Sequence, residues 1–369
     1  MKSSSLVFRQ LVIEILFSSM FLILGISALH AQDSVINIRL SYKVILNPAN
    51  GNRPANATDV NINRAVRGMN TLLRSYWRGY RMQLTEIVEI GGLGDTSGPG
   101  KWYNTDLGTT SKINMERDAE NDPVAYAWRD NDINIYINAG QGGGICSFPP
   151  LNPGNDEEII IIGAVAVIDS STHLHEIGHF FNLCHTHGCC RIPGECNDNN
   201  PHPDEVDDTI PDYSSWSLND IAMHSFSKLY KDLDSGEKQM VDDVADNVMS
   251  YHHLSPLFNP LRRLTEGQLD RWTDATVLYS SRIDVRDGRA IYVASNGGTI
   301  LNSTGYSNSP FSLFWGIFRA SQSGSDVLIL RPGAYNTKQT INKPLTLRAT
   351  RQGAASIGIS SGSTMAASE

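Results

Sequence analysis

Residues 175–185 read HEIGHFFNLCH, and this stretch decides the fold that we expect for the chain. His175 and His179 stand four positions apart, so on a helix both imidazoles lie on one face and can reach one metal ion. Glu176 follows the first histidine, where it can take a proton from a water molecule that the ion activates. With His185 as the third ligand, a fourth coordination position stays open, which is typical of a catalytic zinc site.

The third histidine requires a turn after the helix. His185 is six positions past His179, so a straight helix would not bring it to the same metal ion. The chain has to turn near Asn182, and asparagine is the residue other than glycine that best tolerates the left-handed conformation of such a turn. His187 is the alternative third ligand, with a less suitable offset, and His173 is expected to contact solvent or to support a ligand. A core helix with ordinary buried histidines is the alternative to a metal site.

These residues resemble the metzincin zinc endopeptidases, whose signature is H-E-x-x-H-x-x-G-x-x-H followed by a methionine turn. Asn182 stands at the glycine position of this signature, which is a departure from the family pattern. Residues 247–251 read NVMSY and match the methionine turn. The resemblance implies that Met249 forms an apolar floor beneath the ligands. It also implies that Tyr251 helps to stabilise the tetrahedral intermediate.

Two further segments narrow the resemblance to the pappalysin/cytophagalysin branch of the metzincins. Residues 185–189 read HTHGC, similar to the H-T-F-x-G-x-C of that branch. Residues 204–211 read DEVDDTIP, similar to its D-x-V-x-D-T-P with one extra residue. The acidic segment offers several oxygens from one turning loop, so Asp204, Asp207 and Asp208 are candidate ligands of a calcium ion. A solvated acidic loop is the alternative.

Composition places the chain among globular proteins. Its 369 residues are 40% hydrophobic and 19% charged, with a net charge of −9. This length leaves room for two domains. Because the sequence has neither a basic run nor a basic-aromatic stripe, nucleic acid is not an expected partner.

The first 31 residues are typical of a secretory signal peptide. A basic start is followed by an apolar stretch and by small residues that end at Ala31, where we expect cleavage. An uncleaved membrane anchor is the alternative, and no later segment is expected to span a bilayer. In an exported protein, cysteines can pair, so a disulfide from Cys189 or Cys190 to Cys196 would close the loop after the zinc helix. A zinc site built from these three cysteines is the alternative.

Apolar patterns predict an α/β (α+β) domain with a mixed sheet and an active-site helix. Strands are expected at residues 35–46, 82–90, 133–137, 143–148 and 159–168. Helices are expected at residues 59–80, 170–183 and 220–230, and from residue 265 onward, where Thr265 and Gln268 resemble a capping box. Residues 91–123 are expected to be loop. By the metzincin resemblance, the edge strand 143–148 would hold the substrate backbone by strand addition.

The C-terminal residues 279–369 differ in character, with short apolar runs among serine, glycine and threonine. They predict a small all-β domain, either a few coils of a β-helix or a sandwich, which could contact a surface or a glycan. We therefore expect a signal peptide (1–31), a metzincin-like catalytic domain (32–278) and this C-terminal domain. The expected function is that of a secreted zinc endopeptidase acting on proteins or peptides. The alternative is a catalytically silent, zinc-bearing binding protein, for which Asn182 is the local reason.

Overall fold

The computed structural model describes residues 36–76, 78–146, 148, 158–187, 204, 206–213, 216–252, 263–278, 289–305, 309–322, 326–336, 340–350, 355–359 and 363–366. The expected signal peptide and Cys189, Cys190 and Cys196 lie outside these residues. No helix within these ranges is long and apolar enough to cross a membrane.

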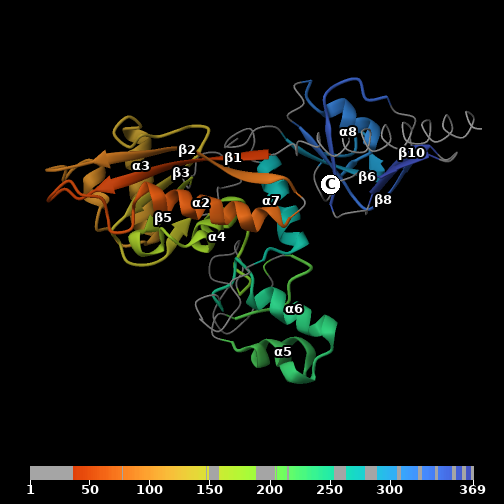
Figure 1. Ribbon diagram of the computed structural model, residues 1–369, viewed down its shortest axis with the longest axis horizontal. Helices are drawn as coiled ribbons and strands as arrows, with labels where there is room; N and C mark the ends of the chain where they lie inside the picture. The colour runs from red at the N-terminus through yellow and green to blue at the C-terminus, as the bar shows by residue number, and fades with distance from the viewer. Residues whose placement is uncertain are drawn as a thin grey trace, which may run out of the picture.

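A five-stranded sheet in the order β2-β1-β3-β5-β4 forms the centre of the N-terminal part (Figure 1). Four strands are parallel: β1 (Ile36–Leu46), β2 (Tyr80–Gly91), β3 (Ile133–Asn138) and β5 (Ile159–Gly163). The short strand β4 (Gly144–Cys146) pairs with β5 in the antiparallel direction and forms the edge of the sheet. The predicted mixed α/β architecture, including its edge strand, is therefore confirmed. The strand predicted at 159–168 ends earlier, at Gly163, where the 3₁₀ helix η2 (Ala164–Ala166) begins.

Helices cover both faces of this sheet. Helices α2 (Asp59–Arg74) and α4 (Ser170–Phe180) pack against one face, in a core that includes Ile135 and Ile137 of β3. Helix α3 (Thr109–Asn121) packs against the opposite face, in a second core that includes Tyr136. Alternate residues of one strand thus enter different cores, as the two-residue period of a strand requires.

The prediction that residues 91–123 form a loop is wrong. They contain a short 3₁₀ helix, η1 (Pro99–Trp102), and helix α3. The buried side of α3 includes Lys112 and Glu116, both fully buried, with Nζ and Oε2 3.4 Å apart. Because two charged residues occupy buried positions of this helix, its sequence carries little of the apolar periodicity that marks an amphipathic helix.

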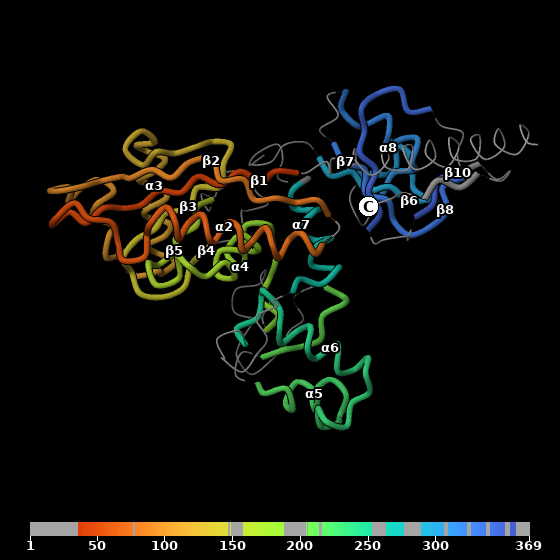
Figure 2. Tube along the Cα trace, viewed as in Figure 1, coloured from red at the N-terminus to blue at the C-terminus, as the bar shows by residue number. Residues whose placement is uncertain are grey.

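A separate helical lobe projects below the sheet (Figure 2). It consists of α5 (Leu218–Phe226), the 3₁₀ helix η3 (Tyr230–Asp232) and α6 (Ser235–Ala245) around a small core of their own. Capping boxes start both α-helices, at Ser217 for α5 and at Asp234 for α6. Helix α5 spans 218–226 rather than the predicted 220–230, and α6 was not predicted at all. Helix α6 leads directly into residues 247–251.

Helix α7 (Glu266–Leu278) connects this region with the C-terminal part. There, β6 (Ala290–Gly298), β7 (Val327–Leu330) and β9 (Thr346–Ala349) form a parallel sheet. A second sheet contains β8 (Gly333–Asn336), β10 (Ala355–Ile359) and β11 (Ser363–Ala366). Helix α8 (Leu313–Arg319) packs on β6, so this part is not all-β as expected. The prediction of short strands in this part did not include a helix over the apolar run LFWGIFR of α8.

Candidate metal centre

Helix α4 supplies two of the three histidines. Its N-cap is Asp169, whose side chain accepts hydrogen bonds from the Ser171 backbone N–H and the Thr172 hydroxyl. His175 and His179 are nearly buried, and their Nε2 atoms lie 3.1 Å apart. The four-residue spacing thus places both imidazoles on one face, as the sequence predicts.

The turn at Asn182 brings the third histidine to the other two. Asn182 has φ = 65°, in the left-handed region that its position requires. The Asn182 N–H donates to the His179 carbonyl, and the Leu183 N–H donates to the Gly178 carbonyl, each at 2.8 Å. These two bonds make a Schellman motif with asparagine in place of glycine. His185 Nε2 then lies 3.1 Å from Nε2 of His175 and 3.0 Å from that of His179.

This trio fits a tetrahedral metal ion. The Nδ1 atoms of His175 and His179 lie 2.8 Å from the carbonyl oxygens of Val248 and Leu183, so these nitrogens carry the protons. The corresponding Nε2 atoms are left with lone pairs that point at one another, an arrangement that a cation at their centre stabilises. Zinc–nitrogen bonds of about 2.0–2.1 Å at tetrahedral angles place ligand nitrogens roughly 3.3 Å apart, close to the separations here. In the described part of the chain, this trio is the one group of His, Cys, Asp or Glu side chains that could hold a metal ion.

Met249 lies directly against the ligand helix. Its side chain is fully buried, and its Sδ would lie 2.6 Å from a Cβ atom at Gly178, so only glycine fits there. The Val248 carbonyl of the same turn holds His175. Residues 247–251 therefore support the ligand helix from below.

Glu176 lies between the histidines and the edge strand β4. Its side chain is 5% exposed, and burial raises the pKa of its carboxyl to about 8, while the Cys146 backbone N–H opposes this shift. A bound cation would lower the pKa by favouring the carboxylate. A Cβ at Gly144 would lie 2.6 Å from Glu176 Cγ, so the glycine makes room for the acid beside the strand. The sequence predicts only an edge strand here, and the run Gly142-Gly143-Gly144 is its one sign that a side chain approaches the strand closely.

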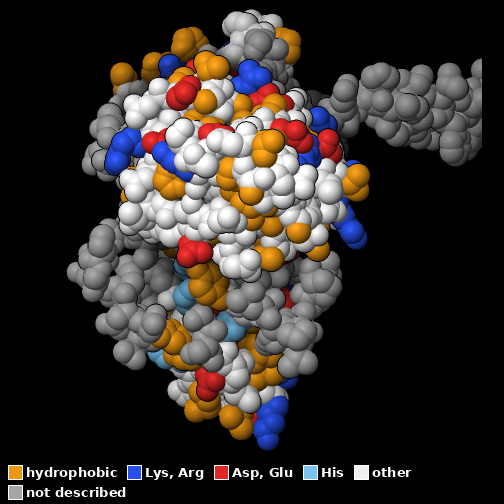
Figure 3. Space-filling view, turned by 90° about the vertical axis from the view of Figure 1, so that its left-hand side faces the viewer, with side chains coloured by type: hydrophobic (Ala, Val, Ile, Leu, Met, Phe, Trp, Pro, Cys, Tyr) orange, Lys and Arg blue, Asp and Glu red, His pale blue; other side chains and the backbone are white. Residues whose placement is uncertain are grey.

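Tyr251 and His187 flank His185. The Tyr251 ring is 39% exposed, and its centroid lies 4.6 Å from that of His185. Burial, with a smaller effect of the Glu176 carboxylate, raises the pKa of Tyr251. His187 stacks on His185 with ring centroids 4.8 Å apart, and it does not belong to the trio. Figure 3 shows several histidine side chains in the lower half of this face, beside hydrophobic side chains.

His173 does not reach solvent. It is buried, with Nδ1 2.9 Å from the Tyr42 hydroxyl and Nε2 3.2 Å from the Val167 carbonyl oxygen. Burial lowers the pKa of this imidazole to about 4. His173 therefore joins α4 to β1 rather than contacting the trio through these bonds.

Helix α7 holds the site from its far side. Gln268 exchanges hydrogen bonds with Asn247, which starts the methionine turn, and Arg271 Nε donates to the Asn182 carbonyl at 2.5 Å. Thr265 and Gln268 form the predicted reciprocal cap at the start of α7. The capping pattern was visible in the sequence, but the contacts to residues 247 and 182 follow only from the fold.

The calcium prediction loses its support. Asp208 accepts hydrogen bonds from Thr265 and from the Gly267 N–H at the start of α7. Asp204 is buried and accepts bonds from Thr209 and Gln268. The carboxylates of Asp204 and Asp208, two of the three candidate ligands, therefore accept hydrogen bonds from residues at the start of α7. Within the described ranges, these acids do not form a group that could hold a metal ion.

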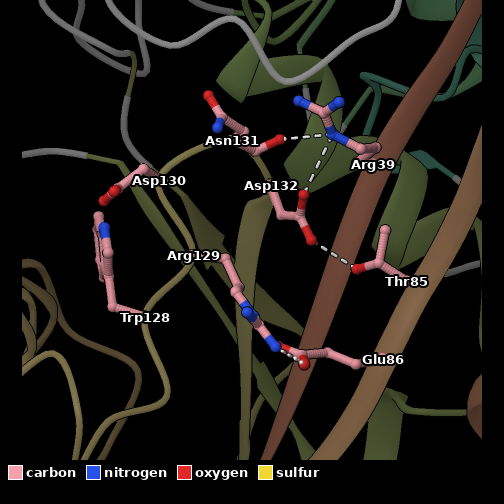
Figure 4. Close-up of a pocket in the computed structure, with 8 residues that line it drawn as sticks. All are labelled: Arg39, Thr85, Glu86, Trp128, Arg129, Asp130, Asn131 and Asp132. Atoms are coloured by element: carbon pink, nitrogen blue, oxygen red, sulfur yellow. Dashed lines mark hydrogen bonds and ion pairs between the residues drawn. The ribbon is translucent and has the colours of Figure 1, made fainter.

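A polar pocket of about 560 Å³ lies elsewhere, over β1, β2 and the segment before β3 (Figure 4). Arg39 Nε lies 3.2 Å from Asp132, and Arg129 Nη2 lies 2.6 Å from Glu86. Both arginines of the pocket are thus paired with acids of the same pocket, so it offers little net charge to a ligand.

Comparisons with known proteins add limited information. No family model matches the chain, and no curated protein matches it. Among solved structures, the chain is similar to a mutant of Tannerella forsythia promirolysin, with 15% identity, 69% of this chain and 83% of that chain covered, and a TM-score of 0.43. It is also similar to a structure of a chaperone-substrate complex, with 13% identity, 45% and 27% coverage and a TM-score of 0.26. These similarities are too low to assign a family or an activity.

Proposed function

We propose that this protein is a secreted, zinc-dependent endopeptidase of the metzincin type. One observation carries the proposal: three histidine Nε2 atoms lie 3.0–3.1 Å from one another, and the buried Glu176 follows the first of them. The methionine turn beneath the trio and the antiparallel edge strand beside it support the same assignment.

The residues of the site divide the chemistry of peptide hydrolysis among them. A zinc ion held by the trio would supply a Lewis acid and lower the pKa of water. Glu176 acts as the general base that removes a proton from the attacking water, and then passes this proton to the leaving amine. The half-exposed Tyr251 donates a hydrogen bond to the oxyanion as it develops.

Strand β4 provides a place for the substrate backbone. It is the last strand in the sheet order, and Glu176 contacts it through Cys146 and Gly144. An extended peptide that pairs with β4 would run past Glu176 and the trio. This arrangement suits cleavage within a chain, since both directions of the peptide can follow the strand.

The test is Glu176→Gln in the mature protein. We expect the variant to bind zinc at wild-type stoichiometry and to lose peptide cleavage by at least about 1,000-fold, on the order expected when a general base is removed. The control is Glu89→Gln, an exposed acid that pairs with Arg53 far from the site and should leave cleavage unchanged. A Glu176→Gln variant that cleaves a peptide library at the wild-type rate would refute the assignment of the base.

An activity assay of the wild-type protein distinguishes the proposed protease from the alternative, a catalytically silent zinc-binding protein. Asn182 was the local reason for that alternative, and its φ of 65° is the conformation that the turn between the ligands needs. Zinc-loaded wild type should cleave casein and should stop when a chelator removes the metal. Stoichiometric zinc without any cleavage would favour the binding protein instead.

A further inference from the structure

We propose that Asp212 is a positioning residue of this centre, which fixes both the loop of the third ligand and the backbone around Tyr251. The inference rests on the proposed zinc site. Sequence motifs do not mark this residue, because it follows the acidic segment 204–211 and matches no position of the family pattern.

Asp212 is fully buried and collects hydrogen bonds from several segments. Its Oδ2 accepts from the Thr186 hydroxyl at 2.8 Å and from the Ser250 hydroxyl at 3.2 Å. Its Oδ1 lies 2.6 Å from His252 Nε2 and accepts from the Tyr213 N–H at 2.5 Å. One carboxylate thus joins the loop after His185 to the methionine turn.

The hydrogen bond between Thr186 and Asp212 holds the segment that carries His185, the third ligand. His175 and His179 are held by the backbone of α4, whereas His185 lies beyond the end of that helix. Thr186, the next residue, bonds to Asp212 through its hydroxyl and donates its N–H to the Met249 carbonyl at 3.2 Å. The position of the His185 imidazole therefore depends on a segment that Asp212 holds.

The contacts of Asp212 with Ser250 and His252 hold the backbone around Tyr251. Ser250 and His252 precede and follow this tyrosine, and both contact Asp212. The His252 N–H also donates to the Ser250 hydroxyl at 3.1 Å, which closes the turn. Because the backbone is held on both sides, the half-exposed phenol is kept beside His185 without being buried itself.

A carboxylate suits this place better than an amide. It offers two acceptor oxygens, whereas an asparagine side chain offers one oxygen and an NH₂ group that also needs acceptors. Asp212→Asn keeps the shape but leaves part of the network without its bonds. Changes in groups that orient metal ligands typically cost about 10–100-fold in metal affinity or activity.

A buried acid elsewhere gives a matched control. Asp326 is 2% exposed and accepts hydrogen bonds from Arg289 and from the Ser321 N–H, in the C-terminal part. Asp326→Asn should lower stability in a similar way without reaching the metal. Two milder variants each remove one contact of Asp212. Thr186→Val removes the hydrogen bond from the residue after His185, and His252→Ala removes the contact of the residue after Tyr251.

The experiment measures three quantities on folded protein: zinc affinity by competition with a chromophoric chelator, the visible absorption of the Co²⁺-substituted protein, and kcat and KM for one peptide. We expect Asp212→Asn to weaken zinc binding about 10–100-fold, to change the Co²⁺ spectrum and to lower kcat. Thr186→Val should reproduce the loss of affinity, and His252→Ala should lower kcat at nearly wild-type affinity. Asp326→Asn should change none of the three.

The outcomes separate this inference from the proposed function. If wild type binds zinc and cleaves peptides while all Asp212, Thr186 and His252 variants behave like Asp326→Asn, the positioning role is wrong and the protease assignment stands. If Asp212→Asn does not fold, the Thr186→Val and His252→Ala variants decide the question in the same way. A wild type that binds neither Zn²⁺ nor Co²⁺ overturns the proposed function itself.

Discussion

Gly178 and Met249 approach each other so closely that any side chain at residue 178 would collide with the methionine. A Cβ atom there would lie 2.6 Å from Met249 Sδ and 3.2 Å from its Cε. The contact joins the helix that carries His175 and His179 to the turn that closes the site from below. It also explains why a glycine stands in the middle of a helix, where this residue costs about 1 kcal/mol relative to alanine.

Gly178→Ala should therefore destabilise the protein, although alanine is the better helix former. The extra methyl group must displace Met249 or α4, and such overpacking typically costs about 1–3 kcal/mol. Urea unfolding of the variant and wild type measures this cost. The control is Gly236→Ala in α6, where the site is exposed and nothing closer than 3.4 Å meets the methyl group. The control should be neutral or slightly stabilising; equal stability of Gly178→Ala and wild type would contradict the contact.

The third ligand can be identified by comparing His185 with its neighbour. His185→Ala removes one of the three converging Nε2 atoms, so zinc should be lost at micromolar free metal. His187→Phe keeps a ring stacked on His185, which itself stays in the trio. Zinc content after dialysis, measured by elemental analysis, should stay near one per chain in this second variant. The reverse result would make His187 the ligand.

Local spacing was enough to predict the ligand helix and the turn that follows it. The four-residue interval of His175 and His179, and the left-handed preference of Asn182, are properties of neighbouring residues. Strands β1 and β3 were predicted within one residue of their bounds because apolar and polar residues alternate along much of their sequences. The cap formed by Thr265 and Gln268 was also within reach, since a capping box spans only four residues.

Helix α3 and the role of Asp212 could not be predicted, because both depend on contacts that form only in the folded chain. Helix α3 escaped prediction because buried Lys112 and Glu116 compensate each other, and such a pair is visible only once the helix is packed. The role of Asp212 could not be seen for a similar reason. Its partners Thr186 and His252 lie 26 and 40 residues away in the sequence, on opposite sides of it.

Lys43 should make stability depend on pH. This β1 side chain is fully buried, with Nζ 2.6 Å from Ser41 Oγ and 2.5 Å from Asn134 Oδ1. Burial lowers the pKa of its ammonium group to about 7, while the nearby Glu86 and Asp132 carboxylates oppose this shift. In the unfolded chain the lysine titrates near pH 10.4. Between these two values the unfolded state binds more protons, so the contribution of Lys43 to stability rises with pH.

The variant Lys43→Met removes this titration. Below pH 7 both states of the wild type carry the charge, and the folded protein bears the full cost of burying it. We expect the methionine variant to gain stability relative to wild type at pH 6.5, and the gain to shrink as the pH rises toward 10. Urea unfolding of both proteins at several pH values gives this difference, in which the titration of all other groups largely cancels. A difference that does not change between pH 6.5 and 10 would contradict the lowered pKa.

The contact between the two parts of the chain predicts that they unfold together. Arg78 is 2% exposed, and its Nη2 lies 2.5 Å from Asp270 Oδ1 on α7. The hydroxyl of Tyr292, on β6, accepts from Arg78 at 2.5 Å and donates to Asp270 at 2.9 Å. The same hydrophobic core contains Tyr292 of β6 and Trp272 of α7. The C-terminal part is therefore continuous with the core that supports the site.

Asp270→Ala leaves the buried Arg78 guanidinium without its shortest ion pair. Arg78 keeps Glu266 as a partner at 2.8 Å, so the expected loss is that of one hydrogen-bond partner of a charged group, about 1–3 kcal/mol. We expect urea unfolding to remain a single transition at lower urea concentration. Far-ultraviolet circular dichroism and tryptophan fluorescence should report the same midpoint, because Trp272 lies in the shared core. In Asp243→Ala, which removes the partner of the exposed Arg263, the loss should stay below about 1 kcal/mol. Two separate transitions in the wild type would show that the C-terminal part folds by itself, and the ion pair would then join independent domains.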